Sequence, residues 1–139
     1  MPEIPDRLNI DKRDRDLYNF LDCEEILRFK DKGGRRNRKE QFIFAMAYGF
    51  SAGARRALDT TEGFVLAKDL HPDDQALIDA VAIYESKSVE ILTDQKAVFK
   101  IAEEYAHAGV MLLVERIKNV QFGSFEKELE KSLYEILKR

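Results

Sequence analysis

Apolar residues recur at helical spacing along most of the chain, which predicts an all-α fold. A first helix is expected over about residues 14 to 29, because Leu17, Phe20 and Leu21 fall on one face. Gly33-Gly34 then breaks the pattern. A second helix should begin near Asn37, a good N-cap residue with Glu40 three positions later.

The second helix is apolar nearly all round, which is typical of a helix in the middle of a bundle. Gly49 is the predicted end of this helix. A third helix opens at "HPDD", where Pro72 suits the first helical position and is followed by two acidic residues. A short turn or one-turn helix is predicted around residues 89–92.

The fourth predicted helix is the longest, from about residue 94 to residue 118. Gly109 lies inside it at a cost of about 1 kcal/mol relative to alanine, which predicts a kink or a close helix crossing. The last helix begins at Gly123-Ser124. It carries a narrow apolar stripe made of Phe125, Leu129, Leu133, Ile136 and Leu137.

Two segments lack this helical pattern. Residues 1–13 are predicted to be a flexible N-terminal arm, because Pro2 and Pro5 oppose regular structure and charges dominate after Ile10. Residues 51–70 form the longest irregular stretch, with a short extended piece at 64–66 but no expected sheet. The prediction is therefore a single-domain bundle of about five helices over residues 14–139.

The amino-acid composition limits the kinds of protein to which this chain can belong. The 139 residues are 45% hydrophobic and 35% charged, which is typical of a soluble globular domain. A single cysteine, Cys23, excludes an internal disulfide and a cysteine zinc cluster, and we expect it to be a buried small residue. The chain has neither a long apolar run nor the apolar segment of a signal peptide, so a cytoplasmic protein is expected.

The sharpest change in charge lies before the second helix. Between residues 30 and 40 there are six basic side chains against two acidic ones, in a chain of net charge -3. Arginine is suited to phosphate, and paired glycines allow close approach of the backbone. The hypothesis is a contact with DNA phosphates or with an acidic partner; the alternative is a solvated loop. The candidate residues are Lys32, Arg35, Arg36, Arg38, Lys39, Arg55 and Arg56.

Two patterns that resemble catalytic or metal sites are weaker. Glu104 and His107 have the spacing of metal ligands in di-iron bundles, but the matching second copy is missing, so a surface or interhelical histidine is favoured. Asp73, Glu85 and Lys87 formally match a metal-dependent nuclease pattern that requires adjacent strands, whereas a helix is predicted here. We therefore predict no catalytic residue, no metal and no cofactor.

Five segments carry a family resemblance. They are "RDLYNFL", "NRKEQFIFAMAYGF", "TEGFVLAKDLHPDDQALIDAVAIYE", "KIAEEYAHAGVMLLVERI" and "GSFEKELEKSL". In order and character they resemble the small proteins called DNA phosphorothioation (dnd) system-associated protein 4, from about residue 14 to the end. The resemblance implies that the gene of this protein lies near genes of systems that place sulfur in the DNA backbone or restrict unmodified DNA. It supplies no catalytic residue.

The favoured hypothesis is a non-enzymatic accessory protein of such a phage-defence system, contacting DNA or a DNA-processing complex through the basic residues. Phosphate contacts of this kind would be independent of DNA sequence and sensitive to salt. The alternative is a protein–protein adaptor or homo-oligomer that uses an apolar helix face and does not bind nucleic acid.

Overall fold

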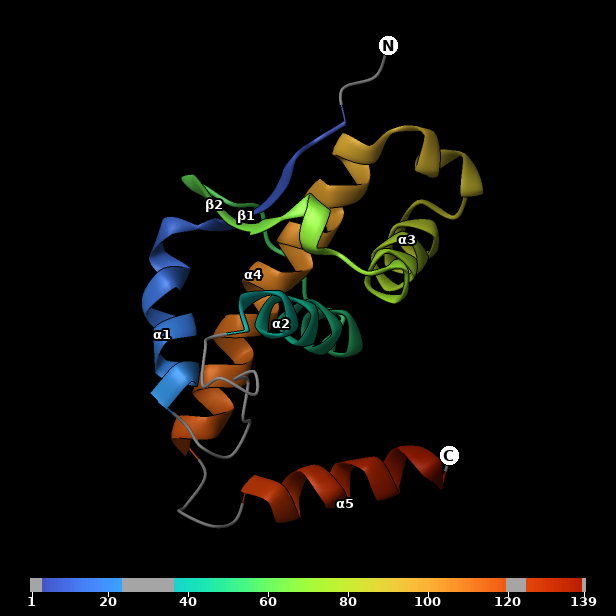
Figure 1. Cartoon of the computed structure of the whole chain (residues 1–139). Coiled ribbons are helices and arrows are strands. Elements are labelled where there is room, and N and C mark those ends of the chain that lie inside the picture. The colour runs from blue at the N-terminus through green and yellow to red at the C-terminus, as the bar shows by residue number, and fades with distance from the viewer. Residues whose placement is uncertain (1–3, 24–36, 120–124, 139) are drawn as a thin grey trace.

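The computed structural model describes residues 4–23, 37–119 and 125–138 (Figure 1). In this part of the chain the fold is mainly helical, as predicted, with one small antiparallel sheet. The elements in order are β1 (Arg7–Asp11), α1 (Arg15–Cys23), α2 (Arg38–Ala52), β2 (Thr61–Leu66), α3 (Pro72–Ser86), α4 (Gln95–Asn119) and α5 (Phe125–Leu137). Short 3₁₀ turns span Lys12–Asp14, Ala67–Asp69 and Val89–Thr93.

Helix starts were predicted well. The Oδ1 atom of Asn37 accepts a hydrogen bond from the backbone N–H of Glu40 at 3.0 Å, so Asn37 is the N-cap of α2. Pro72 is the first residue of α3, and the Oδ2 atom of Asp74 accepts from the N–H of His71 at 2.9 Å. The first predicted helix is confirmed over Arg15–Cys23, and its remainder lies outside the described residues.

Of the two alternatives predicted at Gly109, a kink or a close helix crossing, the structure shows the crossing, and its partner is α2. A Cβ atom added at Gly109 would lie 1.8 Å from the carbonyl oxygen of Ala45. One added at Gly49 would lie 2.2 Å from the carbonyl oxygen of Tyr105. Only glycine allows the two backbones to approach this closely, and α4 continues through the crossing without interruption.

The predicted end of α2 at Gly49 is wrong. The helix continues to Ala52, and Gly53 is its C-cap with a φ of 67°, in the left-handed region that favours glycine. Two glycines four residues apart serve different purposes here. Gly49 allows the contact with α4, and Gly53 allows the chain to leave the helix.

The prediction that residues 1–13 form a flexible arm is wrong for residues 7–11. Arg7–Asp11 form β1, which pairs antiparallel with β2, and its register shifts between Leu8 and Asn9. Leu8 and Ile10 are almost completely buried. The expectation of no sheet was therefore also wrong. The sequence pattern of β1 is an alternation of only two apolar residues among charged ones, which is too short to recognise as a strand. Its partner strand, β2, lies fifty or more residues further along the chain.

The core is one cluster of apolar side chains contributed by both strands and by α1, α2, α3 and α4. Helix α4 is buried along most of its length, and Figure 1 shows it running through the middle of the molecule. Among the α5 side chains that the structure describes, Leu129 packs against this core. The predicted burial of Cys23 falls outside the described side chains. No helix in the described part of the chain is long and apolar enough to cross a membrane.

Candidate functional site

The four candidate basic residues that the structure describes lie in two separate places. Lys32, Arg35 and Arg36 lie outside the described residues. Arg38 and Lys39 stand at the beginning of α2, whereas Arg55 and Arg56 follow its end. A helix of fifteen residues is about 22 Å long, so the two described pairs are far apart.

Arg38 and Lys39 both pair with carboxylates. An Nη atom of Arg38 lies 3.3 Å from Asp22 Oδ2, and its guanidinium group lies 5.1 Å from the centre of the Phe64 ring. The Nζ atom of Lys39 lies 2.9 Å from Asp74 Oδ2, which joins α2 to α3. These contacts compensate the positive charges and hold both side chains against the protein, so they contribute to packing.

Arg55 belongs to a cluster of polar groups from three elements. Its Nε atom lies 2.7 Å from Glu104 Oε1, and its Nη1 atom lies 2.6 Å from Glu85 Oε1. The hydroxyl group of Tyr105 donates to Glu85 Oε2 at 2.5 Å. These two neighbours lower the pKa of Glu85, while burial and the Glu85 carboxylate raise the pKa of Tyr105 to about 12. Glu85 is thus held ionised and Tyr105 neutral at neutral pH, which suits a structural link.

Arg56 is the exception among the described candidates. Its side chain is exposed, and its guanidinium group donates to the sulfur atom of Met111 at 3.6 Å. Its backbone N–H donates to the carbonyl oxygen of Glu104 at 3.1 Å.

The residues of the formal nuclease pattern are separated. Asp73 lies in the first turn of α3 and Glu85 in its last turn, about 18 Å apart along the helix. Lys87 is the C-cap residue of the same helix, with a φ of 60°. Over the described ranges, no group of three or more His, Cys, Asp or Glu residues is placed to hold a metal ion.

Glu104 and His107 point to different partners. Glu104 binds Arg55, whereas Nδ1 of His107 lies 2.5 Å from Asp14 Oδ2, in the turn before α1. His107 and Asp14 are almost completely buried, and burial raises the pKa of Asp14. The sequence favoured a surface or an interhelical histidine; His107 is not on the surface, and it links α4 to the turn before α1.

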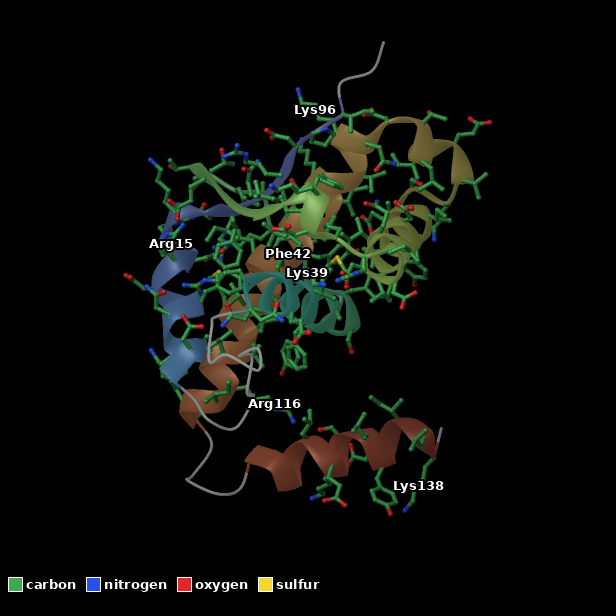
Figure 2. All side chains as sticks on the ribbon, viewed as in Figure 1. Arg15, Lys39, Phe42, Lys96, Arg116 and Lys138 are labelled. Atoms are coloured by element: carbon green, nitrogen blue, oxygen red, sulfur yellow. The ribbon has the colours of Figure 1, made fainter. Side chains whose placement is uncertain are left out.

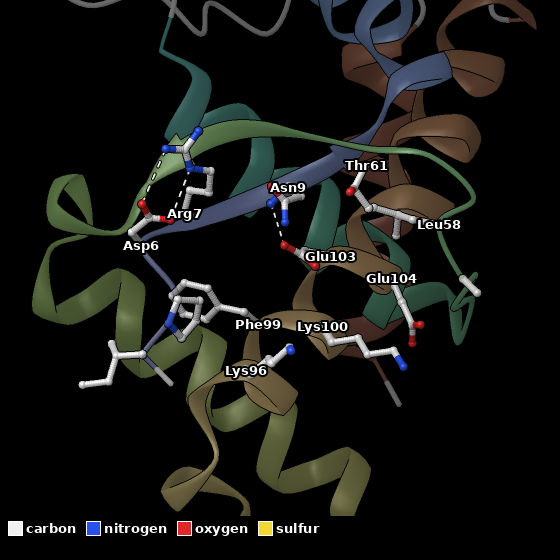
Figure 3. A pocket seen from close by; sticks show the side chains of 13 residues that line it. Asp6, Arg7, Asn9, Leu58, Thr61, Lys96, Phe99, Lys100, Glu103 and Glu104 are labelled. Carbon is white, nitrogen blue, oxygen red and sulfur yellow. Dashed lines mark hydrogen bonds and ion pairs between the residues drawn. The ribbon is translucent and has the colours of Figure 1, made fainter. Parts of the chain in front are cut away.

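A pocket that the sequence analysis missed lies between β1, the loop before β2 and α4 (Figure 3). Its volume is about 750 Å³. Lys96, Lys100 and Glu103 line it from α4, and the Oε2 atom of Glu103 accepts from the backbone N–H of Asn9 at 2.6 Å. Burial raises the pKa of Glu103 to about 7. The available signal was three charged residues at spacing of four and three on one face of a largely buried helix.

The second unusual surface is the apolar stripe of α5. Leu133, Ile136 and Leu137 have exposed fractions of 54%, 56% and 81%, and we call these three residues the α5 stripe. The helix is held to the rest of the protein by Leu129 and by Arg116, whose Nη2 atom donates to Ser132 Oγ at 3.0 Å. Figure 2 shows Arg116 reaching from α4 toward α5.

A shallow hollow lies beside this link. Its volume is about 350 Å³, and it is lined from α2 by Tyr48 and Ala52 and from α4 by Leu112 and Arg116. The Nη1 atom of Arg116 donates to the hydroxyl of Tyr48 at 3.1 Å, so the same arginine touches the hollow and α5. The hollow therefore lies on the side of the α2–α4 pair where α5 is attached.

A family model described as DNA sulphur modification system-associated protein 4 matches residues 21–134. The chain belongs to this family. No curated protein and no solved structure matches it. The resemblance noted in the sequence is thereby confirmed, and with it the association with a DNA sulphur modification system.

Proposed function

We propose that this protein is a non-enzymatic adaptor of the DNA sulphur modification system, and that it docks on another protein of that system through the α5 stripe. The observation that carries the proposal is the exposure of three large apolar side chains, Leu133, Ile136 and Leu137, on one face of one helix. Contiguous apolar residues at helical spacing are the usual anchors of a helix that binds a partner's groove.

The placement of α5 supports this assignment. Leu129 and Ser132, on the same face, contact the body of the protein, while the C-terminal half of the face extends beyond it. The nearby hollow between Tyr48 and Leu112 adds concave surface on the side where α5 is attached. A partner that covers the stripe would thus also reach the α2–α4 pair.

The charges favour a protein partner over the DNA backbone. Arg38, Lys39 and Arg55 already contact carboxylates, so binding phosphate would require these pairs to break. A DNA contact through Lys32, Arg35 and Arg36 stays a prediction, and Arg56 can be added to it because this residue is exposed. It is the second candidate function, and the net positive charge between residues 30 and 40 favours it.

The decisive experiment is co-expression of this protein with the individual components of its own DNA sulphur modification system. A complex isolated by size-exclusion chromatography should survive high salt, because apolar contacts are weakly screened. The triple variant Leu133→Ser, Ile136→Ser, Leu137→Ser should lower the affinity at least about tenfold, since apolar anchors often contribute more than 1 kcal/mol each.

The matched control changes the charged residues of the same helix, with Glu130→Ser, Lys131→Ser and Glu135→Ser. It should keep the affinity. A complex that is unaffected by the stripe variant, or no complex with any component, contradicts the proposal. Self-association measured by light scattering and lost in the stripe variant would assign the stripe to a homo-oligomer instead.

The DNA hypothesis has its own readout. Binding of the purified protein to short duplex DNA is measured by fluorescence anisotropy over a range of salt concentrations. Steep salt dependence that flattens in the Arg35→Ala, Arg36→Ala, Arg38→Ala variant would establish a phosphate contact. Unchanged affinity in the folded variant would remove these residues from consideration.

A further inference from the structure

We propose that two copies of this chain associate through the exposed side of α3, which packs against its own counterpart in an antiparallel pair with two-fold symmetry. Four residues form this surface, which we call the α3 face: Ala76, Leu77, Ala80 and Tyr84. It lies on a different helix from the α5 stripe, and Figure 1 shows α3 apart from α5. The pairing of two copies is therefore independent of the proposed function.

Helix α3 is apolar on the side that faces solvent as well as on the side that faces the core. Its buried residues are Ile78, Val81 and Ala82. Between Asp73 and Ser86, every exposed residue of the helix is nevertheless apolar or aromatic, and these residues are the α3 face. Leu77 and Tyr84 have exposed fractions of 51% and 63%. A surface helix usually carries polar residues on its outer side, so this side is expected to be covered by a partner.

The α3 face has a charged residue at each end. Residues 73, 77, 80, 84 and 87 follow one another at intervals of four, three, four and three, which places them along one side of the helix. Asp73 is exposed in the first turn. Lys87 is exposed at the C-cap, and its Nζ atom lies 5.1 Å from the centre of the Tyr84 ring. The face thus has a negative end, an apolar middle and a positive end.

This order of residues is complementary to itself when two copies run in opposite directions. About a two-fold axis at Ala80, Asp73 of each copy lies opposite Lys87 of the other. Leu77 of each copy likewise lies opposite Tyr84 of the other. Ala80 meets its own counterpart at the axis, where a small side chain lets two helices approach closely. A different partner would need a helix with the reverse order of charges, and a second copy of this chain supplies one.

Tyr84 is held in position before a second copy binds. Its ring lies edge-on against the ring of Phe50, with 5.0 Å between the ring centres. A side chain that is already ordered loses little conformational entropy on association. Tyrosine is also frequent at interfaces, because it combines a large apolar ring with a polar hydroxyl group. An interface built on one helix face is small, so we expect a dissociation constant in the micromolar range.

The first test is sedimentation equilibrium of the full chain over a series of micromolar concentrations. The average mass should rise with concentration toward that of two chains. Ala80→Glu places two carboxylates together at the axis and should weaken association at least about tenfold. The matched control is Ala47→Glu, at an exposed alanine of α2, which should associate like the wild type. The triple variant of the α5 stripe should also associate like the wild type.

The second test exchanges the charges at the ends of the face. Asp73→Lys and Lys87→Asp each place like charges at both ends of the antiparallel pair, so each variant alone should associate at least about threefold more weakly. In an equimolar mixture of the two variants, every lysine lies opposite an aspartate, and association should return to nearly the wild-type strength. Aspartate tolerates the left-handed backbone at position 87, where φ is 60°.

Circular dichroism of each variant checks that its helices are intact. A wild type that stays monomeric over the whole concentration range overturns the proposal. Equal association of Ala80→Glu and Ala47→Glu, or loss of the dimer in the α5 stripe variant, overturns it as well, because another surface would then carry the contact. A mixture that associates no better than the two charge variants alone contradicts the antiparallel pair.

Discussion

The α2–α4 crossing and α5 differ in how much of their apolar surface the fold buries. At the crossing, Gly49 and Gly109 bring two backbones together, and the surrounding side chains are buried. Helix α5 contacts the body through Leu129 and Ser132 and leaves the three side chains of the α5 stripe exposed. The first region holds the fold together, since close packing maximises apolar burial. The second retains apolar surface that the fold does not use, and this exposure is the ground on which we propose it as a binding surface.

The largest expected effect is that of Gly109→Ala. The added methyl group would collide with the Ala45 carbonyl oxygen, 1.8 Å away, so the two helices must separate. We expect a loss of about 3 kcal/mol or more in the free energy of unfolding, measured by urea denaturation. The matched control is Gly53→Ala, where the new Cβ atom meets nothing within 4 Å but φ is 67°. Its cost should be about 1 kcal/mol, and equal costs would refute the tight crossing.

A second large effect is expected at the buried pair of Asp14 and His107, next to the same core. Asp14→Ala leaves His107 without its partner and should cost about 3 kcal/mol in the free energy of unfolding. Asp14→Asn preserves a hydrogen-bonding side chain and should cost less. A double-mutant cycle with His107→Ala measures the coupling, and additive effects would show that the two side chains stabilise the protein independently.

A smaller effect, dependent on pH, is expected for Glu103 at the margin of the core. Its pKa is raised from 4.5 to about 7 by burial, so the folded protein keeps a proton that the unfolded chain loses. The stability that this proton confers is present below pH 4.5 and is lost as the pH rises through about 7.

Replacing Glu103 by glutamine removes this ionisation while keeping an acceptor for the Asn9 N–H. At pH 8 the free energy of unfolding of Glu103→Gln should therefore exceed that of the wild type by about 2 kcal/mol, measured by urea denaturation. At pH 4 the two free energies should be nearly equal. A difference that is the same at both pH values would exclude ionisation of Glu103 as its cause.

The smallest effect on stability is expected for the α5 stripe. Because Leu133, Ile136 and Leu137 are exposed, their joint replacement by serine should change the free energy of unfolding by only about 0.5 kcal/mol. Leu113→Ala, in the buried face of α4, should cost about 2–5 kcal/mol in the same measurement. If the stripe variant were as destabilising as Leu113→Ala, the contrast between the two regions would disappear, and the stripe would be part of the core.

Local features of the sequence were enough to predict the helices. Asn37 and Pro72 mark helix starts because their effects on the backbone are confined to one turn. Gly109 stood out in a long helical pattern, which predicted a close approach. The pattern could not name Gly49 as its partner, because an isolated glycine near the end of an apolar helix looks like a C-cap.

The candidate surfaces also have some features that the sequence predicts and others that only the tertiary structure shows. The apolar stripe of α5 could be predicted from the helical spacing of its residues. This spacing does not show whether the stripe is buried or exposed in the folded protein. The ion pairs of Arg38, Lys39 and Arg55 join residues from different elements, and the pocket of Lys96, Lys100 and Glu103 needs β1 as its opposite wall. The sequence by itself determined where helices form, because helix formation depends on neighbouring residues. The tertiary structure decided which charges are compensated, which apolar face stays open and where a pocket lies, because these depend on contacts between distant segments.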